Sequence, residues 1–72
     1  MNERDFLIRI GEILQQSKPL SKNDVLADIP EWDSLSQITV VAFFKNTLHK
    51  PIPFDTVKNA KCVGDLLEFF VA

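Results

Sequence analysis

The chain has 72 residues, 46% of them apolar, and carries a formal net charge of −2. A chain of this length forms a single domain, residues 1–72, whose core is barely large enough for independent folding and leaves no room for a large enzyme cleft. The slightly acidic charge disfavours nucleic acid as a partner.

Three further features bear on the cellular setting. Cys62 is the only cysteine, so no internal disulfide can form. Charged and apolar residues alternate through residues 1–12, where a signal peptide would have an apolar block. The longest uncharged run, residues 34–44, is well short of the roughly 20 residues that cross a membrane as a helix. We therefore expect a soluble, cytoplasmic protein without a membrane span, and we also expect it to be monomeric.

The first predicted element is a helix over residues 3–16. Its apolar residues recur with helical spacing and form one stripe, made of Phe6, Leu7, Ile10, Ile13 and Leu14. Asn2 can cap the first turn with its side chain. The segment Ser17–Pro19 is expected to end the helix.

Residues 17–32 predict a long loop, which in a small domain is more often functional than not. Four apolar residues are expected to pin this loop to the core: Val25, Leu26, Ile29 and Trp32. The end of the loop is acidic, with Asp24, Asp28, Glu31 and Asp33. Taken alone, this acidic stretch is most simply a solvated loop.

A second helix is predicted over residues 34–48. Asp33 is a suitable N-cap, because its carboxylate can accept hydrogen bonds from the free amides of the first turn. Pro51 and Pro53 are expected to stop the helix. The β-branched residues at 38–41 favour a strand instead, but strict alternation is absent and the segment is longer than an ordinary strand.

This second helix carries two apolar stripes on different sides. The first stripe is assigned to the core and consists of Val40, Val41, Phe44 and Leu48. The second stripe is then expected at the surface, directly beside Ser34, and consists of Leu35, Ile38 and Ala42.

Two more helices are predicted after the prolines. One covers about residues 54–59, and the other covers about residues 63–70 with an apolar face made of Val63, Leu66, Leu67 and Phe70. The predicted fold class is therefore all-α: a four-helix bundle of three main helices and one short helix, with a long loop after the first helix.

Catalytic and metal chemistry have little support in the sequence. His49 and Cys62 are the only residues of their types, which is too few for a closed metal site. A hydrolytic triad would require Ser34 and His49 to share a proton, but a helix with a rise of ~1.5 Å per residue separates them by about 22 Å. We expect no catalytic residue and no metal, and we place His49 at the surface.

Ser34 is instead a candidate for modification. It would occupy the first position of the second helix with its hydroxyl exposed. The free amides and the positive end of the helix dipole favour a phosphate ester at that position. By spacing alone, an ordinary serine at a helix start is the simpler interpretation.

The wider pattern resembles the acyl carrier protein family. The residues that carry the resemblance are Asp33-Ser34-Leu35 at a helix start, Ile52-Pro53 after that helix, and the final segment VGDLLEFF at residues 63–70. The resemblance extends from about Val25 to Phe70. The combination of these motifs is more specific than the DSL triplet alone.

The resemblance implies a 4'-phosphopantetheine arm on Ser34, transferred from coenzyme A by a phosphopantetheinyl transferase and carrying an acyl group as a thioester. Asp33 and Leu35 match the residues that flank the attachment serine. Apolar positions that open a pocket for the acyl chain in the family correspond here to Phe44, Ile52, Ala60 and Leu66. The implied partners are the transferase and acyl-loading, condensing or acyltransferase enzymes, and the chain itself would not be an enzyme.

Partners are expected to dock on the surface around the serine, at Leu35, Ile38, Ala42, Asp28 and Glu31. Fatty-acid carriers of the family usually have acidic residues along the helix after the serine, whereas residues 34–48 contain none, and Trp32 replaces the usual small residue. This departure implies a dedicated carrier in a specialised pathway, for example polyketide-like, modified-lipid or aminoacyl loading. The competing hypothesis is an unmodified helical interaction domain that uses the Leu35, Ile38 and Ala42 stripe.

Overall fold

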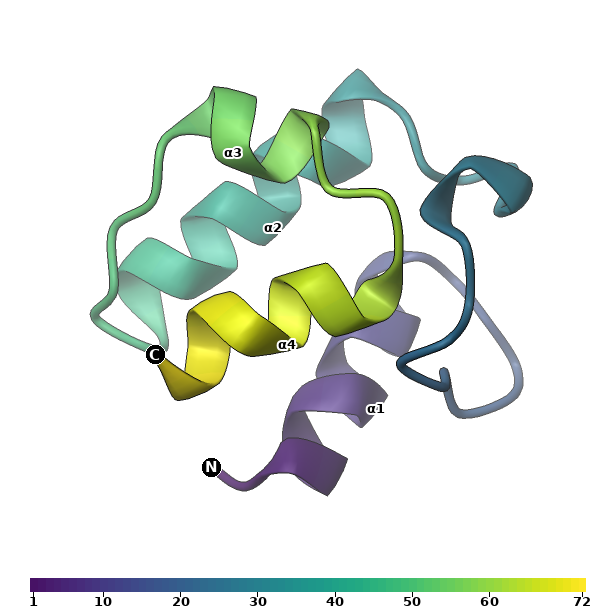
Figure 1. The fold of residues 1–72 in the computed structure, drawn as a ribbon, viewed down its shortest axis with the longest axis horizontal. Helices are drawn as coiled ribbons and strands as arrows, with labels where there is room; N and C mark the ends of the chain where they lie inside the picture. Colours follow the sequence, from purple (N-terminus) through teal and green to yellow (C-terminus); the bar gives the residue numbers. More distant parts are fainter.

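The computed structural model describes all of residues 1–72 and shows a helical bundle (Figure 1). The elements are, in chain order, α1 (Glu3–Ile13), a 3₁₀ turn η1 (Leu26–Asp28), α2 (Ser34–Asn46), α3 (Phe54–Lys58) and α4 (Val63–Val71). α2 packs against α3 and α1, and α1 also packs against α4. The predicted all-α bundle with a long first loop is confirmed. None of the helices combines the length and the apolar character that crossing a bilayer requires.

α1 is shorter than the predicted helix over residues 3–16. Its end is set by Gln15, which adopts a left-handed φ of 57°. The N–H of Gln16 then turns back to the carbonyl of Gly11 at 2.9 Å and satisfies one of the free carbonyls at the helix end. This backbone closure ends the helix before the Ser17–Pro19 segment is reached. At the other end, Asn2 caps the helix as predicted.

α2 also ends before the predicted boundary at residue 48, and the prolines are not what ends it. His49 adopts a left-handed φ of 56°. The N–H of Lys50 returns to the carbonyl of Phe44 at 2.9 Å. Pro51 therefore follows a helix that has already closed.

A lysine side chain links the segment between α2 and α3 to the end of α4. The ammonium group of Lys50 donates to the carbonyl of Phe70 at 2.6 Å and to the carbonyl of Ala72 at 2.7 Å. Carbonyls at a helix C-terminus have no partner inside the helix, and the negative end of the helix dipole favours a cation there. Lys50 therefore acts as a side-chain cap for α4.

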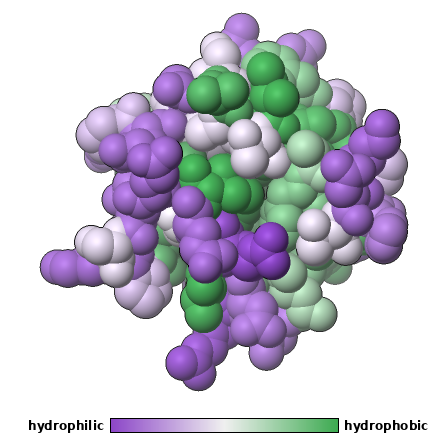
Figure 2. Space-filling view, turned by 180° about the vertical axis from the view of Figure 1, so that it is seen from behind, coloured by the Kyte–Doolittle hydropathy of each residue, from purple (hydrophilic) through white to green (hydrophobic).

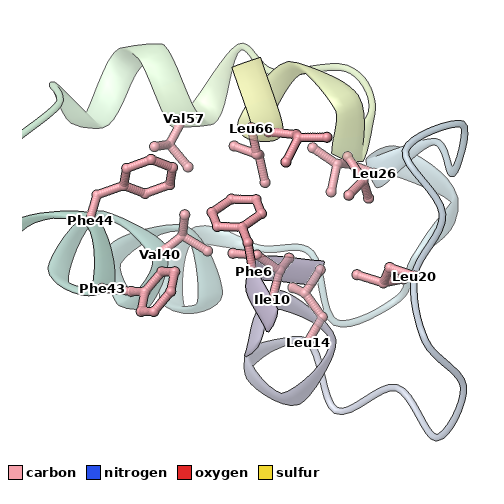
Figure 3. Close-up of a cluster of buried hydrophobic side chains, with 12 residues drawn as sticks. Phe6, Ile10, Leu14, Leu20, Leu26, Val40, Phe43, Phe44, Val57 and Leu66 are labelled. Atoms are coloured by element: carbon pink, nitrogen blue, oxygen red, sulfur yellow. The ribbon is translucent and has the colours of Figure 1, made fainter. Parts of the chain in front are cut away.

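The core is one cluster of twelve buried apolar side chains (Figure 3): Phe6, Ile10, Leu14, Leu20, Leu26, Val40, Phe43, Phe44, Val57, Val63, Leu66 and Leu67. Phe6 of α1 joins three elements. Its ring stacks on Phe70 of α4 with centroids 4.8 Å apart and meets Phe44 of α2 edge-on at 5.7 Å. Such aromatic pairs add about 0.5–1.5 kcal/mol each to the effect of area burial.

The long loop between α1 and α2 is fastened to the start of α4 by backbone hydrogen bonds. Three bonds of 2.9 Å join Leu26 N–H to the Lys61 carbonyl, Val63 N–H to the Asp24 carbonyl and Gly64 N–H to the Lys22 carbonyl. The loop is therefore ordered by pairing with a segment that is distant in sequence.

Three of the four predicted loop anchors are confirmed. Leu26 is fully buried, and Ile29 and Trp32 pack against the core. The prediction for Val25 is wrong, because its side chain is 46% exposed. Val25 pairs with Cys62 in an isolated antiparallel bridge. In extended backbone neighbouring side chains point to opposite sides, so burying one side chain here turns the other outward.

A side-chain carboxylate caps the backbone at the start of α4. The Asp65 carboxylate accepts the backbone N–H of Lys61 at 2.9 Å and that of Cys62 at 3.3 Å. These two bonds stabilise the charged carboxylate, and they hold the pKa of Asp65 below its ordinary value.

Candidate functional site: the start of α2

Ser34 is the first residue of α2, and its side chain is exposed. The preceding Asp33 accepts the N–H of Ser36 at 3.0 Å, and the Ser36 hydroxyl accepts the N–H of Asp33 at 3.0 Å. This reciprocal capping box holds the backbone on both sides of Ser34. The Ser34 hydroxyl takes no part in it, so the structure presents a free hydroxyl on a fixed helix end.

The first turn of α2 also offers unpaired backbone donors. The N–H groups of Ser34 and Leu35 have no acceptor within the chain. No acidic side chain lies inside this first turn, so the Asp33 cap is the one carboxylate bonded to the positive end of the helix dipole. A phosphate ester on Ser34 would lie beside these donors, which is a favourable setting for an anion.

The acidic stretch before α2 is not a uniform free surface. Asp24 accepts a backbone N–H of its own turn at 2.8 Å, and Asp33 is the helix cap. Glu31 is half-buried and accepts the side-chain amide of Gln16 at 2.9 Å. Asp28 and Glu31 are the two acids that were predicted to dock partners. Asp28 is exposed, whereas Glu31 links the loop to the residues that follow α1 through its hydrogen bond with Gln16.

The outer stripe of α2 lies at the surface, as its spacing predicts. The side chains of Leu35 and Ile38 are 74% and 56% exposed, and Ala42 is also exposed. Between them, the Thr39 hydroxyl donates to the Leu35 carbonyl at 3.0 Å, so its polar group is already satisfied. Figure 2 shows the face of the molecule that carries α2, with apolar surface gathered between hydrophilic side chains.

The inner side of α2 is broader than the sequence analysis allowed. Val40 and Phe44 are fully buried as predicted, but Phe43 is buried as well. The polar side chains of Ser36 and Gln37 are also buried. The burial of Phe43 could have been predicted from its position three residues after Val40. A helix in a globular core buries a stripe that is wider than one row of side chains.

The four residues of the expected acyl pocket belong to the same core. Phe44 of α2 and Leu66 of α4 are fully buried, and Ile52 and Ala60, on either side of α3, pack against them at partial burial. None of these four residues lines a cavity.

No catalytic arrangement surrounds Ser34. His49 is exposed and follows the end of α2, whereas Ser34 begins that helix. No group of three or more His, Cys, Asp or Glu side chains is arranged to hold a metal ion. The groups present at the start of α2 are the free Ser34 hydroxyl and the neighbouring backbone N–H donors.

Comparison with known proteins points to one family. The chain is 32% identical to an acyl carrier protein of Kineococcus radiotolerans over 73 aligned positions, which cover 94% of this chain and 90% of that relative. No protein-family model matches the chain, and no solved structure matches it.

Proposed function

This chain belongs to the acyl carrier protein family, whose members are carriers and not enzymes, and on that premise we propose that it carries acyl groups as thioesters on a 4'-phosphopantetheine arm attached to Ser34. The observation that carries the proposal is the exposed Ser34 hydroxyl on the first turn of α2, beside unpaired N–H donors. Asp33 fixes this turn as its cap, and the exposed Leu35 offers an apolar contact to the modifying enzyme.

Attachment is a transfer from coenzyme A. The Ser34 oxygen forms a bond to the phosphorus that bears the pantetheine, the nucleotide part of coenzyme A leaves, and the transferase accepts the hydroxyl proton. The product is a phosphodiester, and its oxygens lie where the N–H groups of Ser34 and Leu35 can donate to them.

The test is the intact mass of the chain after incubation with coenzyme A and a broad-specificity phosphopantetheinyl transferase. We expect a gain of one phosphopantetheine group. Ser34→Ala should abolish the gain, while Ser17→Ala, a change at another exposed serine, should leave it intact. A modified Ser34→Ala variant would overturn the assignment. An unmodified wild-type chain would leave the exposed α2 stripe as the basis of the alternative, an unmodified interaction domain.

The acyl chain is proposed to enter the core between α2, α3 and α4, among Phe44, Ile52, Ala60 and Leu66. These side chains are packed together without a cavity, so an incoming chain must displace them. Each methylene that leaves water contributes about 0.8 kcal/mol, so longer chains should open the core more readily than short ones. The expected result is that thioester hydrolysis slows as the acyl chain lengthens. An unchanged rate across chain lengths would contradict this pocket.

The pathway is proposed to be specialised, not housekeeping fatty-acid synthesis, because α2 has no acidic side chain and ends with Lys45 in its last turn. We propose that docking to loading, condensing or acyltransferase enzymes depends more on Ile38 than on charge. Exposed charge pairs contribute typically under about 1 kcal/mol and weaken with salt, whereas apolar burial does not. Ile38→Ala should therefore weaken binding at low and high salt alike. If salt abolishes binding and Ile38→Ala does not affect it, loop charges such as Asp28 dominate.

The remaining proposals concern the state of the protein. We propose that residues 1–72 form one carrier domain, because a single core cluster includes side chains from all four helices. A cytoplasmic location is supported by the single, unpaired Cys62, which matches a reducing compartment. A monomeric state is the simplest arrangement for a carrier that offers one face to successive enzymes, and sedimentation equilibrium tests it.

A further inference from the structure

A groove follows the seam between α1 and α2. It consists of two adjoining hollows of about 180 and 260 Å³ that share Ile13 of α1 and Thr39 of α2. The first hollow extends to the capped start of α2, and the second extends past its last residue to Thr47. The groove therefore accompanies α2 along most of its length, beside the exposed stripe.

The middle of the groove is apolar and shallow. Ser36 of α2 lines only the first hollow, and the other α2 residues that line the groove share one side of the helix: Leu35, Thr39, Ala42, Phe43 and Asn46. The side chains at 39 and 42 are small, so a second element can approach the α2 backbone closely at this point. This row begins with Leu35, the most exposed large apolar side chain of the molecule.

The two ends of the groove carry opposite charges. Glu31 and Asp33 line the hollow at the start of α2. Arg9 lines the hollow at the other end, where its guanidinium lies 5.5 Å from the centroid of the Phe43 ring. The Arg9 side chain is 50% exposed and pairs only through Nε with Glu12, at 3.4 Å, so its terminal nitrogens face solvent without a carboxylate partner.

We propose that this α1–α2 groove docks an amphipathic helix of a partner protein, oriented antiparallel to α2. Helices favour acidic side chains in the first turn and basic side chains in the last turn, because these offset the helix dipole. In the antiparallel orientation the acidic first turn meets Arg9, and the basic last turn meets Glu31 and Asp33. Apolar side chains at helical spacing fill the middle, as in other complexes of a helix in a groove.

The partner's identity as an enzyme that acts on the carried acyl group rests on the proposed function, but the groove itself does not depend on Ser34 being modified. A helix of about 12 residues, at ~1.5 Å per residue, spans the length of α2. The probe is a synthetic helix of that length with glutamates in its first turn, leucines on one face and lysines in its last turn. It is titrated into the unmodified, ¹⁵N-labelled chain.

We expect the amide shift changes to concentrate on the groove, at residues such as Thr39 and Asn46. Ala42→Trp fills the groove and should abolish the binding, whereas Ala27→Trp, at an exposed alanine outside it, should not. Shift changes centred on another surface would overturn the proposal, as would unchanged binding by the Ala42→Trp variant. Concentration-dependent shifts of the groove without peptide would identify a second copy of the chain as the occupant and would overturn it too.

Charge reversal tests the orientation independently of the tryptophan variants. Arg9→Glu should weaken peptide binding about two- to five-fold, as expected for an exposed charge pair. Arg4→Glu makes the same change on α1 outside the groove and should have no effect. A peptide with glutamine in place of its first-turn glutamates should lose the sensitivity to Arg9→Glu. If it does not, the acidic end of the helix does not meet Arg9 and the antiparallel orientation is wrong.

Discussion

The starts of α2 and α4 are closed by the same kind of capping box, yet they sit in opposite surroundings. At α2, the two residues between the capping partners Asp33 and Ser36 are exposed, and the N–H groups of these residues, Ser34 and Leu35, are unpaired. At α4, the two residues between Cys62 and the capping Asp65 are Val63 and Gly64, and their N–H groups donate to carbonyls of the first loop. A capping box thus fixes where a helix begins but leaves open what covers that beginning.

The difference separates recognition from stability within one small domain. The start of α4 orders the long loop, and the loop in turn supplies buried side chains to the core. The backbone N–H donors at the start of α2 have no such partners within the chain and remain available to another molecule. Changes at the start of α4 should therefore affect folding, whereas changes at Ser34 should affect modification without affecting folding.

The largest effect is expected from the loop residue that faces α4. Leu26→Ala removes a fully buried side chain next to the backbone bond to Lys61 and should lower the free energy of unfolding by about 2–5 kcal/mol. Val25→Ala, at the neighbouring exposed position, should cost far less. Urea unfolding followed by circular dichroism measures both. Equal losses would show that the loop is not anchored through Leu26.

The two glycines should respond in opposite directions. A Cβ on Gly64 would lie 3.0 Å from the Lys22 carbonyl oxygen, so Gly64→Ala should force the fastened loop away and lower the free energy of unfolding by about 1–3 kcal/mol. A Cβ on Gly11 would meet Leu20 at an ordinary 3.8 Å. Gly11→Ala should therefore raise helix propensity and stabilise the protein by up to about 1 kcal/mol. Thermal melts that shift in the same direction for both variants would contradict this.

A smaller, pH-dependent effect is expected at Asp65. Its pKa is lowered in the folded chain by the N–H donors of Lys61 and Cys62, from an ordinary 3.8. Its contribution to stability is therefore complete above the unfolded-state pKa and is lost as the pH falls through the lower folded-state pKa. Asp65→Asn should destabilise the protein at neutral pH, and the difference from wild type should shrink in acid. A difference that stays constant with pH would show that the carboxylate charge does not matter.

The smallest effect on stability is expected at Ser34. Ser34→Ala removes an exposed hydroxyl that forms no hydrogen bond, so the free energy of unfolding should change by less than about 0.5 kcal/mol. Asp33→Ala, one residue earlier, removes the cap and should cost about 1 kcal/mol. Chemical unfolding of the two variants checks the contrast. A large loss in Ser34→Ala would show that the serine has a structural role.

Local signals in the sequence predicted the helix starts well. Asn2 and Asp33 cap the helices that they were expected to cap, because a cap depends only on the next few residues. The exposure of Ser34 followed from the same signal. Helical spacing also predicted the two apolar sides of α2, although the predicted buried side omitted Phe43.

Features that depend on distant residues were not predictable in the same way. Both longer helices are followed within three residues by a non-glycine residue with left-handed backbone, Gln15 after α1 and His49 after α2, where the sequence offers no glycine signal. The outward turn of Val25 depends on backbone pairing with Cys62 in the segment before α4. The half-burial of Glu31 depends likewise on contact with α1. These features depend on tertiary packing, which cannot be predicted from local helix propensity or from the spacing of apolar residues.

The position of Phe6 makes assembly of this core an all-or-none event. Its ring belongs to the first helix but contacts Phe44 in the middle of the chain and Phe70 near the end of the described structure. No contiguous half of the chain can complete this aromatic cluster, because contacts between distant segments form only after the loops between them have closed. A state in which α1 has detached would expose several phenylalanine rings at once. Partly folded forms should therefore be scarce at equilibrium and prone to aggregate when heat or crowding populates them.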